Sequence, residues 1–223
     1  QGLLLGMVIG AVVMLMLLLM VVLLYFYCLW ANREAPVPRQ AFRTRELIDA
    51  LDDRILVLDG AMGTELERRG ARMDAPLWSA HALIEQPDCI RNIHLEYLRA
   101  GAQVLTTNSF RTHARNLAAG GPEMAAQADA LTRRSVELAR QARARYCQQA
   151  GDVPIRIAGA ISPLGDCFEP HNSPGYAEAL APHRDIARSL AAGGCDLFLI
   201  ETMSKIDEAT AAIRAASGFG LPI

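Results

Sequence analysis

The sequence of 223 residues has little of several features that mark common protein classes. It has one lysine, few aromatic residues (6%) and a net charge of only −2, so its charge predicts no nucleic-acid partner. Its five cysteines are scattered without a CxxC pair or metal-finger spacing. This pattern favours free thiols in a reducing compartment. A GxGxxG motif is also missing, which weakens the case for a dinucleotide-binding unit.

Charge is missing altogether from Leu3 to Trp30, a run made mostly of leucine, valine, methionine and isoleucine. About twenty such residues cross a bilayer, so we expect a transmembrane anchor at residues 1–31. The arginines that follow it predict a single-pass membrane protein with its catalytic domain in the cytoplasm. A secretory signal peptide is one alternative. A mispredicted gene start is another, and it would leave the protein in the cytoplasm.

The remaining sequence divides into a linker and one domain. Ala35-Pro36-Val37-Pro38 predicts a stiff, extended segment within a linker over residues 32–44. The domain is expected over residues 45–223 and begins with a short helix at 45–53. Within it, apolar and polar patterns predict strands at 55–58, 103–105, 155–158, 196–200 and 221–223. Helices are predicted at 87–99, 122–149, 176–192 and 205–216.

Strands and helices therefore alternate about four times, which indicates an α/β fold with a parallel sheet. An open doubly wound sheet and a (β/α)8 TIM barrel both fit this alternation. The barrel is favoured, truncated after about four β/α units and preceded by the transmembrane helix. Residues 55–58 are expected to form its first strand, buried on both faces.

Polar side chains follow four of the predicted strands at their carboxyl ends: Asp59, Thr106 to Asn108, Ser162 and Glu201. In a barrel these ends converge on one mouth, where such enzymes keep their active sites. The alternative for Asp59 is a capping role at the next turn. Because polar groups recur at the same end of all four strands, we favour a site.

Five motifs resemble the homocysteine S-methyltransferase family in wording, order and approximate spacing. The stretch from Leu58 to Gly70 reads LDGAMGTELERRG, and later stretches read PLWS, IHLEYLRAGA followed by TTNSF, GAISPLG and LIET. The likeness covers about residues 46–223 and is strongest to S-methylmethionine-linked members. It implies a (β/α)8 barrel that transfers a methyl group from a sulfonium-type donor to the thiol of homocysteine, giving methionine.

The resemblance implies zinc as the cofactor, bound by three cysteines that would lie downstream of Ile223. Zinc would hold the homocysteine sulfur as its thiolate, the nucleophilic form of a thiol. Cys195 stands in half of the expected GGCC motif, but it precedes a strand and is interpreted as a buried structural residue. Cys167 is interpreted as a loop cysteine without a ligand role. No metal ligand and no catalytic residue is assigned, and the chain as given is expected to be inactive.

The resemblance assigns the amino-acid-binding part to residues that are present. Asp59 and Glu201 would hold the ammonium group of homocysteine, and backbone N–H groups at Ala61, Met62 and Gly63 would bind its carboxylate. Thr107 and Asn108 are also expected to lie near the substrate. His94 is interpreted as a packed or capping histidine.

The leading hypothesis is thus a homocysteine methyltransferase whose partners are homocysteine, a small methyl donor and, through residues 3–30, a membrane. No oligomeric state is predicted. One alternative is a non-catalytic half-barrel fragment or interaction module. Another is a barrel enzyme that uses a carboxylate pair without a metal.

Overall fold

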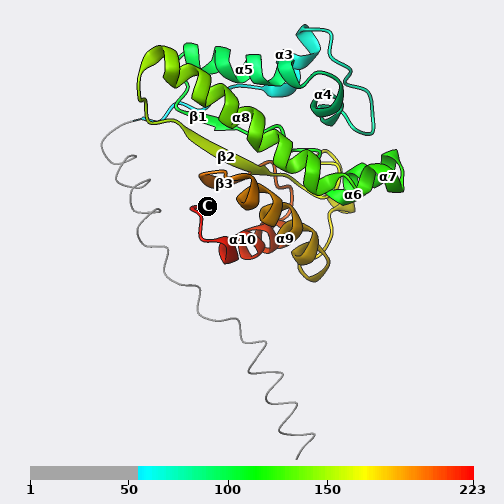
Figure 1. The fold of residues 1–223 in the computed structure, drawn as a ribbon. Coiled ribbons are helices and arrows are strands. Elements are labelled where there is room, and N and C mark those ends of the chain that lie inside the picture. The colour runs from blue at the N-terminus through cyan, green and yellow to red at the C-terminus, as the bar shows by residue number, and fades with distance from the viewer. Residues whose placement is uncertain (1–54) are drawn as a thin grey trace, which may run out of the picture. The chain divides into compact units, whose positions relative to one another are not determined.

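The computed structural model of the chain describes residues 55–223, and the fold is that of this part (Figure 1). It belongs to the second of two compact units, Gln1–Pro38 and Arg39–Ile223. The predicted linker at 32–44 and the predicted opening helix at 45–53 lie outside the described residues.

A three-stranded parallel sheet forms the centre of the described region. Its strands are β1 (Val104–Thr106), β2 (Arg156–Ile161) and β3 (Leu197–Ile200), and they lie in the order β1-β2-β3. Leu105 pairs with Ile157 across the first ladder, and Gly159 pairs with Phe198 across the second. All three strands therefore end at the same edge of the sheet, and the residues that follow them are brought close together.

Helices account for most of the remaining chain. The α-helices are α3 (Met62–Arg68), α4 (Ala80–Glu85), α5 (Pro87–Arg99), α6 (Ala114–Leu117), α7 (Pro122–Ala125), α8 (Ala128–Ala150), α9 (Tyr176–Gly193) and α10 (Ile206–Ala216). Short 3-10 helices lie at Ala118–Gly120, Pro170–Asn172 and Ser217–Phe219. Helices α5, α8, α9 and α10 contact one another in chain order and pack against the sheet as one layer.

Local sequence explains where the longer helices begin and end. Helix α5 starts at Pro87, because proline suits the first turn of a helix, where its missing N–H costs nothing. Helix α9 ends before Gly194, which adopts a left-handed conformation at φ 87°. The helix predicted over 122–149 is interrupted, since the Gln127 N–H bonds three residues back to the Met124 carbonyl rather than four.

The core lies between the sheet and the helix layer. Ile157 in β2 and Phe198 in β3 are almost completely buried there, together with Leu190 of α9. A second cluster joins α3, α4, α5 and α8 around Leu66 and Ile93. The first cluster fixes the strands, and the second fixes the segment that follows residues 55–58.

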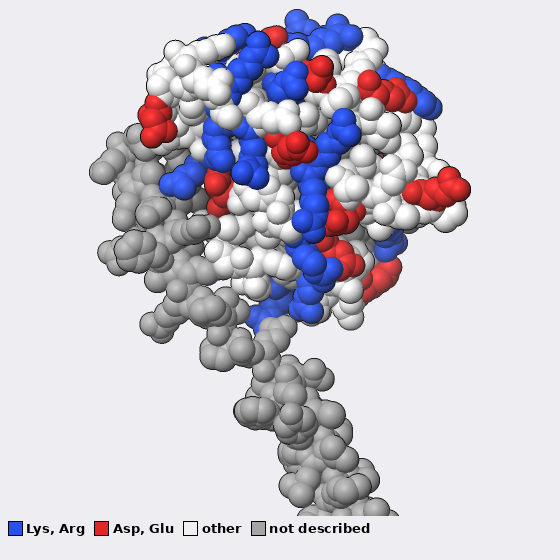
Figure 2. Space-filling view, in the orientation of Figure 1, with Lys and Arg blue, Asp and Glu red and all other residues white. Residues whose placement is uncertain are grey.

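The outer surface of the helix layer carries charges of both signs. Figure 2 shows basic side chains in a band with acidic ones beside them. The helix layer contains charge pairs within one helix, such as Arg133 with Asp129 at 2.9 Å and Arg188 with Asp185 at 2.8 Å. Exposed pairs of this kind add little stability, so this face is a solvated surface.

The predicted (β/α)8 barrel, truncated after about four β/α units, was wrong: residues 55–223 show a partial α/β fold with a three-stranded sheet. Residues 55–58 form a single parallel bridge, Leu58 with Val104, in place of a strand buried on both faces. Ile55, Val57 and Leu58 are 87%, 48% and 50% exposed, because this segment lies at the sheet edge with β1 on one side only. Residues 221–223 also form no strand, although the Phe198 N–H bonds to the Pro222 carbonyl at 2.8 Å.

The predicted transmembrane helix, and the membrane contact and single-pass location that depended on it, are corrected as well. Within residues 55–223, no helix is long and apolar enough to cross a bilayer. The apolar run itself, residues 3–30, lies outside the described residues.

The core position of Ile157 predicts a large effect of truncation. We expect Ile157→Ala to lower the free energy of unfolding by about 2–5 kcal/mol, because it leaves a cavity between β2 and the helix layer. The matched control is Ile206→Ala in α10, where the side chain is 84% exposed and the change should stay within about 0.5 kcal/mol. Urea denaturation measures both, and equal effects would contradict this assignment of the core.

Candidate functional site

Asp59 is held at the carboxyl end of β1 by two hydrogen bonds. Its backbone N–H donates to the Val104 carbonyl at 2.9 Å, and its Oδ2 accepts from the Thr106 N–H at 2.9 Å. The side chain is only 2% exposed. Asp59 does not cap the next helix, because α3 has no side-chain cap. The carboxylate is instead fixed to the end of the sheet.

The second oxygen of this carboxylate, Oδ1, is buried and has no hydrogen-bond partner among the described residues. On the other side, Nδ1 of His94 lies 3.6 Å from Oδ2. A buried carboxylate oxygen without a donor is costly, so such atoms commonly face a ligand or an ion. Asp59 therefore offers one free acceptor at the strand ends.

Glu201 directly follows β3, and its N–H donates to the Ile161 carbonyl at 3.1 Å. Burial raises the pKa of the Glu201 carboxyl, and the nearby charge of Asp59 raises it further. The two carboxylates therefore lie close enough to repel each other. Both residues follow strand segments that end at the same edge of the parallel sheet.

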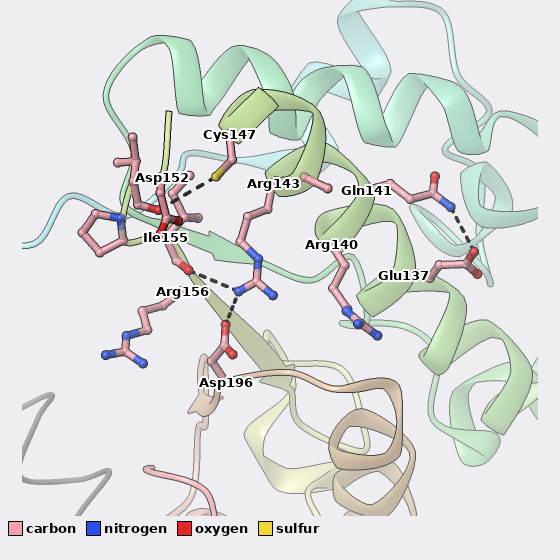
Figure 3. A pocket seen from close by; sticks show the side chains of 12 residues that line it. Glu137, Arg140, Gln141, Arg143, Cys147, Asp152, Ile155, Arg156 and Asp196 are labelled. Carbon is pink, nitrogen blue, oxygen red and sulfur yellow. Dashed lines mark hydrogen bonds and ion pairs between the residues drawn. The ribbon is translucent and has the colours of Figure 1, made fainter. Parts of the chain in front are cut away.

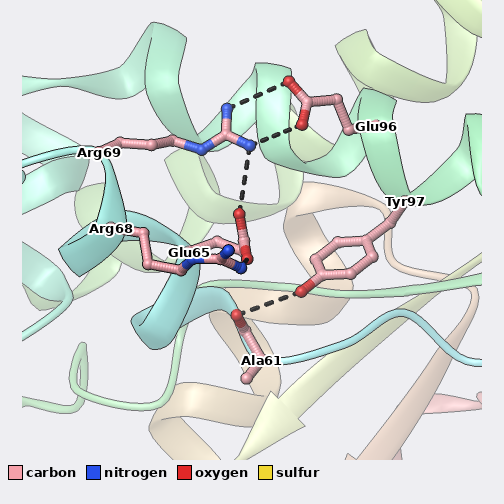
Figure 4. A network of polar contacts seen from close by, with 6 residues as sticks. All are labelled: Ala61, Glu65, Arg68, Arg69, Glu96 and Tyr97. Carbon is pink, nitrogen blue, oxygen red and sulfur yellow. Dashed lines mark hydrogen bonds and ion pairs between the residues drawn. The ribbon is translucent and has the colours of Figure 1, made fainter.

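Ala61, Met62 and Gly63 form the start of helix α3, directly after Asp59-Gly60. The first N–H groups of a helix have no partner within the helix, so they are available to an acceptor. Tyr97 fixes this turn, because its hydroxyl donates to the Ala61 carbonyl at 3.3 Å (Figure 4). The predicted residues thus lie next to the Asp59 carboxylate in sequence and on a turn tied to α5.

A network of charges attaches α3 to α5 (Figure 4). Arg69 contacts Glu96 with both terminal nitrogens, at 3.2 and 2.6 Å, and reaches Glu65 at 3.3 Å. These bonds raise the pKa of Arg69 and lower that of Glu96. A two-pronged contact of this kind adds geometric specificity, so it orients the α3 turn.

Thr107 and Asn108 are buried, and their side-chain hydrogen bonds go to other parts of the fold. The Thr107 hydroxyl accepts the Ala160 N–H at 3.0 Å and pairs with Ser109 at 2.8 Å. The Asn108 amide donates to the Ser79 carbonyl at 3.0 Å. Both residues therefore shape the end of the sheet. Thr107 joins the end of β1 to β2, and Asn108 joins it to the chain before α4.

Ser162 and His113 serve the neighbouring loops. The Ser162 hydroxyl donates to the Phe110 carbonyl at 2.5 Å. His113 accepts the Asn116 N–H on Nδ1 and so donates from Nε2 to the Pro163 carbonyl, at 3.1 Å each. Burial lowers the pKa of His113 to about 3, which keeps it neutral. These contacts make both residues parts of the scaffold.

A cavity of about 730 Å³ lies at the opposite, amino ends of the strands (Figure 3). Two of its charged groups, Arg143 and Asp196, are already paired with each other in the fold. Arg143 contacts Asp196 at 2.6 Å and the Ile155 carbonyl at 3.2 Å, and Asp196 also accepts the Ile157 N–H at 2.8 Å. Ligand sites of parallel α/β folds lie at the carboxyl ends of the strands, so this cavity is not the candidate site.

The described residues contain no group of three histidine, cysteine or acidic side chains that could hold a metal ion. Cys195 is 5% exposed, and burial raises the pKa of its thiol to about 12. A thiol of this kind resists the deprotonation that metal binding needs. Cys167 lies in the loop after β2, away from the other described cysteines in sequence. The residues of this part of the chain therefore do not fit a zinc site.

The contact of His94 with Asp59 was not predicted from the sequence. His94 is completely buried in α5 and lies against a carboxylate 35 positions earlier in the chain. The spacing of apolar residues in α5 predicts that His94 lies on the buried side of the helix, but it does not predict which residue His94 contacts.

Comparisons with known proteins bear on this arrangement. A family model described as homocysteine S-methyltransferase matches residues 56–223. The chain is 41% identical over 175 residues to a homocysteine S-methyltransferase of Escherichia coli (strain K12), covering 74% of this chain and 54% of the relative. It is 34% identical over 180 residues to a selenocysteine methyltransferase of Astragalus bisulcatus, covering 71% and 53%. The chain thus spans about half the length of these curated relatives.

Solved structures of the homocysteine methyltransferase MmuM from Escherichia coli are similar as well. Its oxidised form matches with a TM-score of 0.69 at 37% identity, covering 77% of this chain and 62% of that chain. Its metallated form matches with a TM-score of 0.66, covering 77% and 63%.

The repulsion between Asp59 and Glu201 yields a titration experiment. We expect Asp59→Asn to lower the pKa of Glu201, because it removes one of the two causes that raise it. Carbon-13 NMR of the side-chain carboxyls measures this, and Asp152→Asn, an exposed change at the opposite ends of the strands, is the control. An unchanged Glu201 titration would place the two carboxylates apart.

The same shift has a consequence for stability. A raised pKa means that the fold binds the Glu201 proton more tightly than the unfolded chain does. This contribution is fully present below the unfolded pKa and is lost as pH rises through the folded pKa.

Gly60 is required by the close approach of Tyr97. A Cβ at residue 60 would lie 2.7 Å from the Tyr97 hydroxyl oxygen, so Gly60→Ala must displace that ring and its bond to Ala61. We expect a loss of about 1 kcal/mol in the free energy of unfolding. Gly63→Ala is the matched control, since its nearest neighbour is Met73 Cε at 3.5 Å. In a Tyr97→Ala background, Gly60→Ala should no longer lower the free energy of unfolding measured by urea denaturation. A loss that persists in this background would contradict the explanation.

Proposed function

This chain belongs to the homocysteine S-methyltransferase family, and on that premise we propose that it binds the amino-acid end of homocysteine in a methyl-transfer enzyme. The proposed reaction moves a methyl group from a sulfonium-type donor to the homocysteine thiol and gives methionine. The family match supports the reaction class, and the strand-end residues support the location of the substrate.

The observation that carries the proposal is the pair of carboxylates at the strand ends. Burial, and after it the charge of Asp59, raises the pKa of Glu201, and Asp59 Oδ1 has no donor within residues 55–223. Two recessed carboxylates without a cation are unfavourable, and an ammonium group between them relieves both their repulsion and their loss of water. We therefore assign the ammonium group of homocysteine to Asp59 and Glu201.

The carboxylate of the same substrate would lie at the adjoining turn. Backbone N–H groups at Ala61, Met62 and Gly63 are proposed to bind it. They follow Asp59 by two to four positions, so one amino acid would contact both groups. Thr107 and Asn108 are proposed to act on the substrate indirectly, by fixing the wall of this site through their backbone bonds.

The substrate thiol is mostly protonated at neutral pH, and the thiolate is the form that attacks a methyl group. Zinc, the cofactor that the resemblance implies, supplies that deprotonation when it is bound. The described residues do not fit a zinc site, so we propose for them the binding and orientation of the substrate alone. Correct placement of the sulfur in line with the donor methyl group accounts for much of the rate in such displacements.

Homocysteine binding tests the proposal. We expect Asp59→Asn and Glu201→Gln each to weaken homocysteine binding about tenfold or more, because each leaves the ammonium group with a single carboxylate. Ligand-observed NMR titration of the 223-residue chain measures this, and Glu67→Gln, an exposed change in α3, is the control. Failure of the unaltered chain to bind homocysteine, or equal affinity in all variants, would overturn the proposed function.

A further inference from the structure

We propose that His94 is a positioning residue, whose Nδ1–H holds Asp59 through Oδ2 and leaves Oδ1 directed at the amino group of the substrate. The inference rests on the proposed function and adds a residue to it. It concerns how the site is kept ready for the ammonium group, not which ligand it takes.

Burial is the first observation. His94 is 0% exposed and Asp59 is 2% exposed. Both ring nitrogens of His94 and Oδ1 of Asp59 lack a hydrogen-bond partner in the described part of the chain. Three buried polar atoms without partners within one contact would be costly in a purely structural core. A substrate ammonium group would supply the partner of Asp59 Oδ1, and a shortened contact to Asp59 Oδ2 would supply that of His94 Nδ1.

Geometry is the second observation. Oδ2 of Asp59 accepts the Thr106 N–H at 2.9 Å, and Nδ1 of His94 approaches the same oxygen at 3.6 Å. Both approaches are to one oxygen, so together they fix the carboxylate by Oδ2. The 3.6 Å separation is just longer than a hydrogen bond, and polar contacts of empty sites commonly tighten when the ligand arrives.

The position of His94 in the fold makes it suited to this role. It projects from α5, the helix that also carries Tyr97 and Glu96, which fix the α3 turn. One rigid helix thus contacts both the carboxylate and the turn that follows it. A positional error in Asp59 would be transmitted to the ammonium group, because a charge pair in a recessed site depends strongly on distance.

A packing role makes a different prediction from a positioning role. If His94 only packs in the core, His94→Leu should change the affinity for the ligand little. For positioning, asparagine should replace it better, because its side-chain amide branches from Cγ, as Nδ1 does, and it keeps a donor near Oδ2. The two substitutions therefore separate the roles.

The experiment compares homocysteine with 4-sulfanylbutanoate, which lacks only the amino group. In the 223-residue chain, we expect His94→Leu to weaken homocysteine binding about tenfold and to leave the analogue within about twofold. His94→Asn should recover most of the lost affinity. In an Asp59→Asn background, His94→Leu should have no further effect, because His94 acts through Asp59.

The outcomes distinguish the two proposals. No homocysteine binding by the unaltered chain overturns both. Weakening by Asp59→Asn together with unchanged binding in His94→Leu overturns the role of His94 alone. Equal losses for homocysteine and the analogue also overturn it, since they indicate general disruption.

A measurement without substitution covers the case in which the variants fail to fold. Nitrogen-15 NMR of the His94 ring in the unaltered chain reports which nitrogen carries the proton. We expect the proton on Nδ1, facing Asp59, with homocysteine bound. A proton on Nε2 alone would overturn the proposal.

Discussion

The candidate site depends on two hydrogen bonds that join Asp59 to β1. The Asp59 N–H reaches the Val104 carbonyl, and the Thr106 N–H reaches Asp59 Oδ2, both at 2.9 Å. Ile55, Val57 and Leu58 before Asp59 are largely exposed, although the Val57 carbonyl also accepts the Gln103 N–H at 2.7 Å. These two bonds fix the position of Asp59 and its free Oδ1, and the Tyr97 hydroxyl separately fixes the turn that starts α3.

The parallel sheet then brings the other groups to the same place. Neighbouring strands of β1, β2 and β3 run in one direction, so the segments after them meet at one edge. Glu201 follows β3, and its pKa is raised first by burial and then by the charge of Asp59, a residue 142 positions earlier in the sequence. Helix α5 completes the arrangement, because Tyr97 and His94 approach the Asp59 segment from the side. The site is thus a product of strand direction and one adjoining helix.

The sequence predicted the parts of this arrangement that depend on local pattern. Helix α5 was predicted at its observed bounds, because Pro87 and the apolar spacing mark it clearly. The predicted first strand at residues 55–58 was wrong, and Ile55 is 87% exposed. An apolar run of four residues does not show whether other elements will cover it. The pairing of Asp59 with His94 was not predicted, because it depends on how α5 packs and no spacing encodes that. The break at Gln127 likewise leaves no proline or glycine as a signal.

The two ends of the sheet differ in how their charges are used, and this difference argues for the assignment of the site. At the amino ends, Arg143 and Asp196 are paired at 2.6 Å and also bond the backbone at Ile155 and Ile157, so their charges are compensated within the fold. At the carboxyl ends, Asp59 and Glu201 share a sign, and Asp59 Oδ1 is unpartnered in the region from residue 55 onward. A fold selected for stability alone would pair these charges as it pairs the others. Uncompensated charge is instead expected where a ligand supplies the missing partner, and two carboxylates favour a cation in that position, as the proposed function requires.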